Sequence, residues 1–299
     1  MYKLIAIDID GTLLNSKSEL TEKTKQILKK ATEQGIYIVL TSGRLTDNVK
    51  KFCDEIGADK YLIAENGASI INLQTNKLEY SKYMNKEVVN KVLDVCEENN
   101  IYYMVYTIKE LIVKNIKHMT MFFYKQNYNP NARIKTIVAG RDYIDSVTDN
   151  FTKLMICDED RVIYNSIITK LNKIPEIDVS PVPHISTKKL EIDGQKTTIE
   201  YSYADICEKG ANKWNAIKEL ANRLNIKDEE IIAIGDNIND IKMIENAGLG
   251  VAMANGSPHV RAIANVVAPS NNEDGVACIV EKYALRGRPS KVHFITMQL

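Results

Sequence analysis

Short apolar segments, each followed at once by polar or glycine-containing residues, recur near both ends of this chain. The segments cover residues 4–9, 36–40, 61–64, 231–234 and 249–253. Each has the length of a strand and is apolar on both faces, which is typical of strands buried within a parallel sheet. The stretches between them place apolar residues at helical spacing. This alternation predicts an α/β fold, in which a Rossmann-like parallel sheet is covered by helices.

The middle of the chain follows a different pattern. Helical stripes cover residues 88–96 and 160–171, and β-like, partly polar segments cover 101–107, 111–114, 151–157 and 177–182. This mixture predicts an α+β module with an antiparallel sheet, inserted between the two halves of the parallel domain. We therefore expect a discontinuous core of residues 1–83 and 200–299 and an inserted cap of residues 84–199. The tail, residues 286–299, is basic and then apolar, and it carries no functional interpretation.

The charge balance narrows the range of partners. The 299 residues include 39 Lys plus Arg and 39 Asp plus Glu, so the formal net charge is zero. A nucleic acid or an anionic membrane favours a basic excess, and neither is expected as a partner. No apolar run approaches the roughly 20 residues that a membrane span needs. The five cysteines lack disulfide or metal spacing, which is typical of a reducing compartment. We expect a cytoplasmic protein, either a monomer or a weak homodimer.

Two aspartates follow the first apolar segment, in the run DIDGTL that begins at Asp8. Ligands bind at the carboxyl ends of the strands in parallel sheets of this kind. There Asp8 can attack an electrophile or hold a cation, and Asp10 can reach the same point from the turn. A strand-end turn with a capping aspartate is the alternative, and a lone D-x-D would leave it equally open. The complete run is more specific and favours a catalytic site.

Two further groups of polar residues follow other predicted strands. Ser42 and Gly43 come directly after the second strand, where a hydroxyl and an accessible backbone N–H suit a phosphate oxygen. The alternative is an ordinary capped turn. Arg44 either anchors this loop or touches the ligand, and we favour the anchor. Lys213 begins a later helix and can neutralise a nucleophile and a phosphate together, although solvated lysines are common at such positions.

The fourth group follows the strand at residues 231–234. The run GDNIND places Asp236, Asn239 and Asp240 within five residues, and their side-chain oxygens suit a cation such as Mg²⁺. A polar loop with an Asx turn is the alternative. All four groups lie at strand ends or at a helix start beside the sheet, so they are expected to converge on one crevice.

Together these groups resemble the four motifs of the haloacid dehalogenase superfamily. Further runs, NGA after Glu65, GVAMAN from Gly250 and NEDGV from Asn272, resemble its Cof-like branch. That branch carries a large α+β cap (type IIB) between the second and third motifs, where this chain has its inserted module. Ser42 stands where threonine is commoner, but serine supplies the same hydroxyl. The tail beyond Tyr283 does not match the family pattern.

The resemblance implies a phosphatase that forms an aspartyl phosphate on Asp8. Asp10 would protonate the leaving alkoxide and then deprotonate the attacking water. Mg²⁺ would be held by the Asp8 carboxylate, the Asp10 carbonyl and Asp236, with Thr12, Asn239 and Asp240 in support. Ser42, the Gly43 N–H and Lys213 would stabilise the charge on the phosphoryl oxygens.

Other functions remain as alternatives. A phosphomutase of this superfamily would also form the aspartyl phosphate, but usually has a small helical cap. The non-enzyme alternative is a phosphate-ligand binder or a receiver-like switch. A switch would phosphorylate an aspartate too, but it would not benefit from the acid–base catalyst that Asp10 supplies. A dehalogenase is not expected to carry the full DIDGTL run, and a transport ATPase needs membrane spans. The expected partner is a small phosphorylated metabolite: a hexose, pentose or polyol phosphate, flavin mononucleotide or pyridoxal phosphate.

Overall fold

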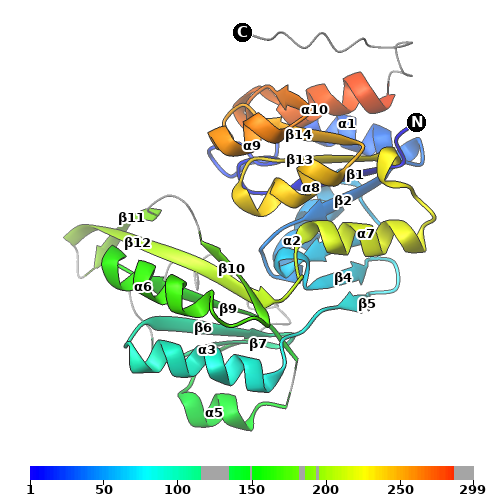
Figure 1. Cartoon of the computed structure of the whole chain (residues 1–299). Helices are drawn as coiled ribbons and strands as arrows, with labels where there is room; N and C mark the ends of the chain where they lie inside the picture. Colours follow the sequence, from blue (N-terminus) through cyan, green and yellow to red (C-terminus); the bar gives the residue numbers. More distant parts are fainter. Residues whose placement is uncertain (116–134, 149, 182–185, 193–194, 286–299) are drawn as a thin grey trace.

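The computed structural model describes residues 1–115, 135–148, 150–181, 186–192 and 195–285, so the tail noted above lies outside the described residues. Two sheets, each with its own helices, make up the described part of the molecule (Figure 1). Within those residues we find no helix that combines the length and the apolar character needed to cross a membrane.

The first sheet is the Rossmann-like parallel sheet predicted from the sequence. Its strands are β1 (Leu4–Asp8), β2 (Tyr37–Thr41), β3 (Tyr61–Ala64), β4 (Ser69–Asn72), β5 (Lys77–Ser81), β13 (Ile231–Gly235), β14 (Leu249–Met253) and β15 (Val266–Ala268). They lie in the order β15-β14-β13-β1-β2-β3-β4-β5. Pairing is parallel from β15 to β3, and β4 and β5 extend one edge as antiparallel strands.

Helices cover both faces of this sheet because its strands are apolar on both sides. On one face, Ile5 and Ile7 belong to the core formed with α1 (Glu22–Glu33), α2 (Thr46–Ile56) and α10 (Gly275–Val280). On the other face, Leu4 and Ala6 belong to the core formed with α7 (Lys213–Arg223), α8 (Ile241–Asn246) and α9 (Pro258–Ile263). Short helical turns are η1 (Glu65–Gly67), η2 (Asp228–Glu230), η3 (Ile238–Asp240), η4 (Asn271–Glu273) and η5 (Glu281–Leu285).

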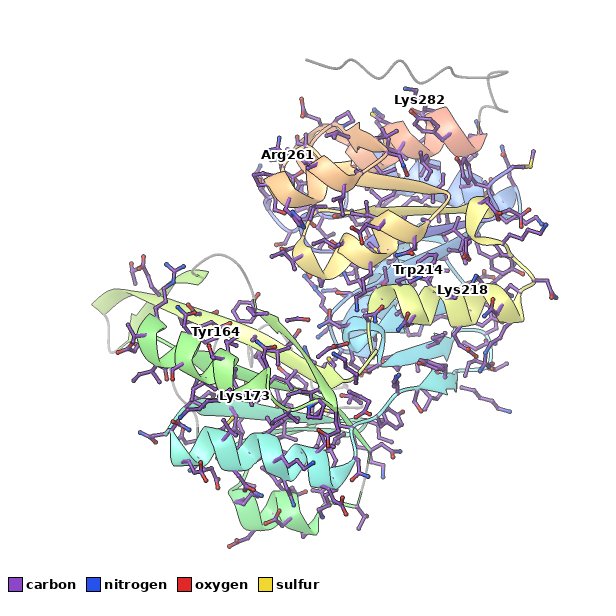
Figure 2. The ribbon with its side chains drawn as sticks, in the orientation of Figure 1. Tyr164, Lys173, Trp214, Lys218, Arg261 and Lys282 are labelled. Atoms are coloured by element: carbon purple, nitrogen blue, oxygen red, sulfur yellow. The ribbon has the colours of Figure 1, made fainter. Side chains whose placement is uncertain are left out.

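The second sheet carries its helices on one face (Figure 1). Its strands are β6 (Tyr102–Thr107), β7 (Glu110–Val113), β8 (Lys135–Val138), β9 (Phe151–Asp158), β10 (Ile177–Pro181), β11 (Ser186–Ile192) and β12 (Gln195–Glu208). They lie in the order β10-β12-β9-β6-β7-β8, with β11 paired to β12. The helices are α3 (Lys86–Glu98), α5 (Arg141–Ser146) and α6 (Arg161–Leu171). Tyr164 lies on α6 (Figure 2). Its hydroxyl donates to the Tyr203 carbonyl at 2.7 Å.

The second sheet extends past the boundary that we placed at residue 199. Strand β12 continues to Glu208, and residues 202–206 pair with β9 in the middle of this sheet. Along this continuation Ala204 and Ile206 face the helices, while Tyr201 lies in the cluster on the opposite face, as expected for alternate residues of a strand. The return to the first sheet begins after Glu208, and α7 starts at Lys213.

Candidate active site

Asp8 and Lys213 form a buried ion pair at the carboxyl end of β1. Lys213 Nζ donates to Asp8 Oδ1 at 2.5 Å and to Asp240 Oδ1 at 2.6 Å. The Lys213 side chain is 1% exposed, so its charge depends on these two partners. The Asn212 side chain caps α7 by accepting from the backbone N–H of Asn215, and this cap fixes the start of the helix that carries the lysine.

Asp240 organises the loop after β13. Its Oδ2 accepts from the backbone N–H groups of Asp236 and Asn237, both at 3.0 Å, while its Oδ1 accepts from Lys213. Gly235 permits this fold of the loop, because a Cβ there would lie 2.5 Å from the Asp240 side chain. The Asp240 carboxylate is therefore occupied by protein donors on both oxygens.

Asp236 lies beside Asp8 because Ile234 and Ile7 are register partners in neighbouring strands. The Thr12 hydroxyl donates to Asp236 Oδ1 at 2.8 Å. Gly11 has a φ of +86°, and a Cβ on it would lie 2.4 Å from Asp236 Oδ2. The turn after β1 can thus approach the Asp236 carboxylate closely only with glycine at this position.

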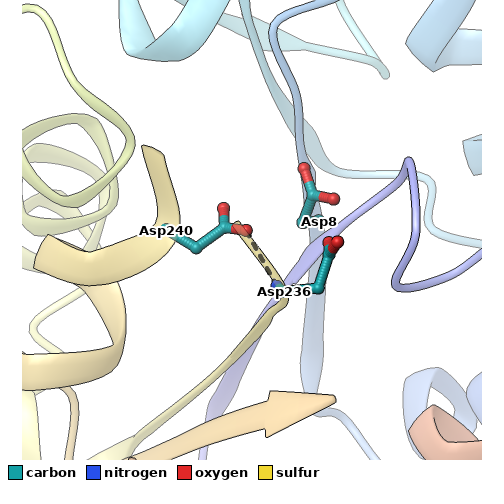
Figure 3. A group of neighbouring side chains, drawn as sticks. All are labelled: Asp8, Asp236 and Asp240. Atoms are coloured by element: carbon teal, nitrogen blue, oxygen red, sulfur yellow. Dashed lines mark hydrogen bonds between the residues drawn. The ribbon is translucent and has the colours of Figure 1, made fainter. Parts of the chain in front are cut away.

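Three carboxylates converge here (Figure 3). One oxygen each from Asp8, Asp236 and Asp240 lies within 4.8 Å of the others. Burial, opposed by Lys213, raises the pKa of Asp8 well above its ordinary value. Burial and the nearby Asp240 raise the pKa of Asp236 to about 7. A group of three acids with one ammonium leaves negative charge in a buried place, so this oxygen donor set fits a hard divalent cation. Because Asp240 is occupied, Asp8 and Asp236 are the carboxylates open to such an ion.

Ser42 and Gly43 lie next to Asp8, since Thr41 is the register partner of Asp8. Ser42 is 1% exposed, and its hydroxyl accepts from the Arg44 backbone N–H at 3.2 Å. A Cβ on Gly43 would lie 2.9 Å from the Asn66 side-chain oxygen, so this loop packs tightly against the loop after β3.

Asp10 is held at the edge of the site by Arg44. The guanidinium donates from Nε to Oδ2 at 2.8 Å and from Nη2 to Oδ1 at 2.5 Å. The Asp10 side chain is 55% exposed, in contrast to the buried Asp8. The pairing of Arg44 with Asp10 was not predicted, since we expected Arg44 to anchor its own loop.

Asn66 and two residues of the second sheet had no place in the sequence-based site. The Asn66 side chain accepts from Asn239 Nδ2 at 3.2 Å and donates to Asp205 Oδ2 at 2.6 Å. Lys153 Nζ in turn donates to Asp205 Oδ1 at 2.9 Å. The Asn-Gly pair after the third strand was a usable signal for Asn66, but Lys153 and Asp205 lie in strands without any recognisable motif.

The chain is similar to known proteins over most of its length. The haloacid dehalogenase-like hydrolase model matches residues 5–280. The Bacillus subtilis protein YxeH is 34% identical over 293 residues, covering 95% of this chain and 99% of its own. The B. subtilis 5-amino-6-(5-phospho-D-ribitylamino)uracil phosphatase YcsE is 26% identical, covering 95% and 96%. A solved haloacid dehalogenase-like hydrolase from Bacteroides thetaiotaomicron superposes with a TM-score of 0.75 at 27% identity, covering 94% and 99%.

The fold, the convergent loops and these similarities define the class of protein: an enzyme that is a hydrolase of the phosphatase type. The chain belongs to the haloacid dehalogenase-like hydrolase family, in its Cof-like branch. The resemblance of the sequence motifs to this family is thereby confirmed.

Proposed function

We propose that the protein is a magnesium-dependent phosphatase of small phosphate monoesters that works through an aspartyl phosphate on Asp8. The observation that carries this proposal is the ion pair between Lys213 and Asp8, which lies next to Asp236 and the loop after β2. A lysine on one carboxylate oxygen of Asp8 leaves the other oxygen available for attack. It also supplies positive charge where a phosphoryl group would sit.

The proposed reaction has two steps. In the first, an Asp8 carboxylate oxygen bonds to phosphorus, the ester P–O bond breaks, and Asp10 gives its proton to the leaving alkoxide. In the second, water loses a proton to Asp10 and attacks phosphorus, and the bond to Asp8 breaks to release inorganic phosphate. Ser42, the Gly43 N–H and Lys213 would donate to the phosphoryl oxygens in both steps, as donors already positioned before charge develops on those oxygens.

The metal would be held by the carboxylates of Asp8 and Asp236 and by the backbone carbonyl of Asp10. When bound, Mg²⁺ neutralises charge on the transferring group. Thr12 supports the metal site by fixing Asp236 at 2.8 Å. Asp240 supports it by holding Lys213 and the loop backbone, and Asn239 does so through its hydrogen bond to Asn66.

We also propose a division of labour between the two sheets. The first sheet would carry the chemistry, and the second sheet, with α3, α5 and α6, would act as a cap that reads the ester group of the substrate. YcsE acts on a ribityl phosphate, so polyol and sugar phosphates, flavin mononucleotide and pyridoxal phosphate form the panel to test. A cytoplasmic monomer or weak homodimer suits this role.

The deciding experiment measures hydrolysis of p-nitrophenyl phosphate and of that panel by the purified chain. Excess chelator should abolish turnover and Mg²⁺ should restore it. Ca²⁺ should restore little, because its larger and looser coordination shell does not suit a site for a small octahedral ion. Undiminished turnover in excess chelator would remove the metal from the proposal. Transfer of the phosphoryl group to a second sugar, rather than to water, would favour the phosphomutase alternative.

A further inference from the structure

Lys153 and Asp205 form an ion pair on the face of the second sheet that meets the first sheet's loops. They lie on neighbouring strands, β9 and β12, and their charged groups are 2.9 Å apart. The two side chains are only 6% and 15% exposed. Lys153 Nζ also lies over the Tyr106 ring, 4.8 Å from its centroid. The pair is therefore a preformed, buried unit of the second sheet.

Each member of this pair also contacts a loop of the first sheet. Lys153 Nζ donates to the Gly43 carbonyl at 3.0 Å, and Asp205 Oδ2 accepts from Asn66 Nδ2 at 2.6 Å. The second sheet thus supplies one hydrogen-bond donor, Lys153, and one acceptor, Asp205. The first sheet supplies the matching acceptor, the Gly43 carbonyl, and the matching donor, Asn66. Asn66 extends the contact to the loop after β13, because its side chain accepts a hydrogen bond from Asn239.

A buried pair of this kind is more useful for orientation than for stability. Burial of two charges is expensive, and the attraction between them repays it only with good geometry and extra hydrogen bonds. Here the extra hydrogen bonds come from Gly43 and Asn66 across the junction. If the second sheet moved away, Lys153 and Asp205 would keep each other but lose these two partners. The contact can therefore be fully made in only one arrangement of the two sheets.

We propose that Lys153 and Asp205 are positioning residues that dock the second sheet onto the loops after β2 and β3, where Gly43 and Asn66 lie. This docking would align the ester group of the substrate. This inference rests on the proposed function for its kinetic consequences, but the docking contact itself does not depend on it. The three groups at the junction, Lys153, Asp205 and Asn66, are called the docking set below.

The first test uses Lys153→Met, which keeps the apolar stem and removes both hydrogen bonds. Its matched control is Lys91→Met, which removes a more exposed lysine of the same module whose partner is Glu176. Hydrogen–deuterium exchange of peptides covering residues 42–45 and 65–68 should accelerate in Lys153→Met and remain unchanged in Lys91→Met. Exchange that is unchanged in both variants overturns the docking contact, whatever the enzymatic activity.

The second test compares kcat/KM for the best substrate of the phosphate-ester panel with kcat/KM for acetyl phosphate. Acetyl phosphate has only a small leaving group for the second sheet to contact. For Lys153→Met we expect kcat/KM on the panel substrate to fall about tenfold or more, since a misplaced substrate can cost up to roughly 100-fold. The fall on acetyl phosphate should be much smaller. Equal falls on both would show that the pair acts on the chemistry instead, and would overturn the positioning role. A wild-type chain without phosphatase activity would refute the proposed function and leave the exchange result to decide the docking contact.

A second pair of variants approaches from the other sheet and leaves Lys153 in place. Asn66→Asp sets two carboxylates against each other, and aspartate tolerates the φ of +57° at this position. We expect it to reproduce the effects of Lys153→Met on exchange and substrate preference. Adding Asp205→Asn restores one donor and one acceptor and should recover most of the loss. Failure of the double variant to recover either property would overturn the assignment of the docking set.

Discussion

Arg44 donates to both carboxylate oxygens of Asp10, at 2.8 and 2.5 Å, and so fixes the side chain proposed as the acid–base catalyst. The Arg44 side chain is itself 15% exposed, and its guanidinium carbon lies 5.5 Å from the centroid of the Phe52 ring. A two-pronged contact of this kind fixes direction as well as distance. The loop after β2, which carries Arg44, therefore controls the direction of the Asp10 side chain.

Arg44→Lys should consequently impair proton transfer by Asp10 more than phosphate binding. A lysine ammonium lacks the planar pair of donors that binds both Asp10 carboxylate oxygens. We expect a loss of about 10- to 100-fold in kcat on an alkyl phosphate, which is part of the roughly 100- to 10,000-fold that acid–base catalysis supplies. On p-nitrophenyl phosphate, whose leaving group needs no proton, the loss in the first step should be much smaller. Burst-phase kinetics on both esters check this, and equal losses would contradict it.

Asp8→Asn should remove at least about 99% of turnover, because a missing nucleophile costs several orders of magnitude. Asp10→Asn should cost less and should let the phosphorylated intermediate accumulate. Acid-quenched samples from radiolabelled substrate would show that species in Asp10→Asn and not in Asp8→Asn. Labelled protein in Asp8→Asn would place the nucleophile elsewhere.

Gly11→Ala should weaken metal binding. The new methyl group would meet Asp236 Oδ2 at 2.4 Å, so the carboxylate must move. By analogy with other groups that orient metal ligands, we expect an affinity loss of roughly 10- to 100-fold for Mg²⁺, measured by calorimetry. Gly35→Ala is the matched control, since Gly35 has a similar φ of +82° but nothing within 4 Å of its Cβ position. A similar loss in both variants would attribute the effect to backbone strain.

Lys213→Met should destabilise the metal-free protein strongly. It leaves the buried Asp8 and Asp240 carboxylates without their cation, and breaking a buried pair costs about 3–5 kcal/mol. Lys218→Met on the same helix removes a half-exposed lysine paired with Asp228, and such surface pairs contribute about 0–1 kcal/mol. Denaturant unfolding in the presence of chelator measures both. Comparable costs would mean that the Lys213 pair is not buried in solution.

Glu65→Gln should change how stability depends on pH. Burial raises the pKa of Glu65, although Ser69 and the Thr46 backbone donate to its carboxylate. The folded protein then holds a proton that the unfolded chain has released. That stabilising contribution is complete below the ordinary glutamate pKa and is lost as pH rises through the folded pKa.

The variant lacks this titration. The free energy of unfolding of the variant minus that of the wild type should therefore increase as pH rises. The increase is measured by denaturant unfolding at pH values from about 4, near the ordinary glutamate pKa, to about 8. Glu245→Gln, on an exposed glutamate of α8, is the control. A difference between Glu65→Gln and wild type that does not change with pH would contradict the buried titration.

The first sheet was predictable because its strands are short, apolar and separated by helical stripes. Parallel topology then places Asp8, Ser42 and Asp236 at one edge, and the structure has them on neighbouring strand ends. The extent of the second sheet was not predictable. Its last strand mixes charged and apolar residues on alternate faces, and a periodicity of two gives no sign of where such a strand ends.

The contacts between the two sheets escaped sequence analysis for a different reason. Lys153 and Asp205 are far apart in the chain, and each alone looks like an ordinary polar residue in a strand. Only the pairing of β9 with β12 brings them together, and only the approach of Gly43 and Asn66 gives them partners. Arg44 escaped because its partner, Asp10, lies in a turn whose direction the sequence does not specify.

The position of β1 in the middle of the first sheet has a consequence for the order in which the chain folds during synthesis. β1 pairs with β2 on one side and with β13 on the other, and β13 begins only at Ile231. Among the described residues, the strand pairings of the second sheet lie between residues 102 and 208, so a ribosome delivers those strands while β1 still lacks β13. We expect the later-made half of the chain to close around an already folded insertion. Asp8 and Asp236 meet only in that last event, so under the proposed mechanism we expect the nascent chain to hydrolyse phosphate esters only after most of it has been made.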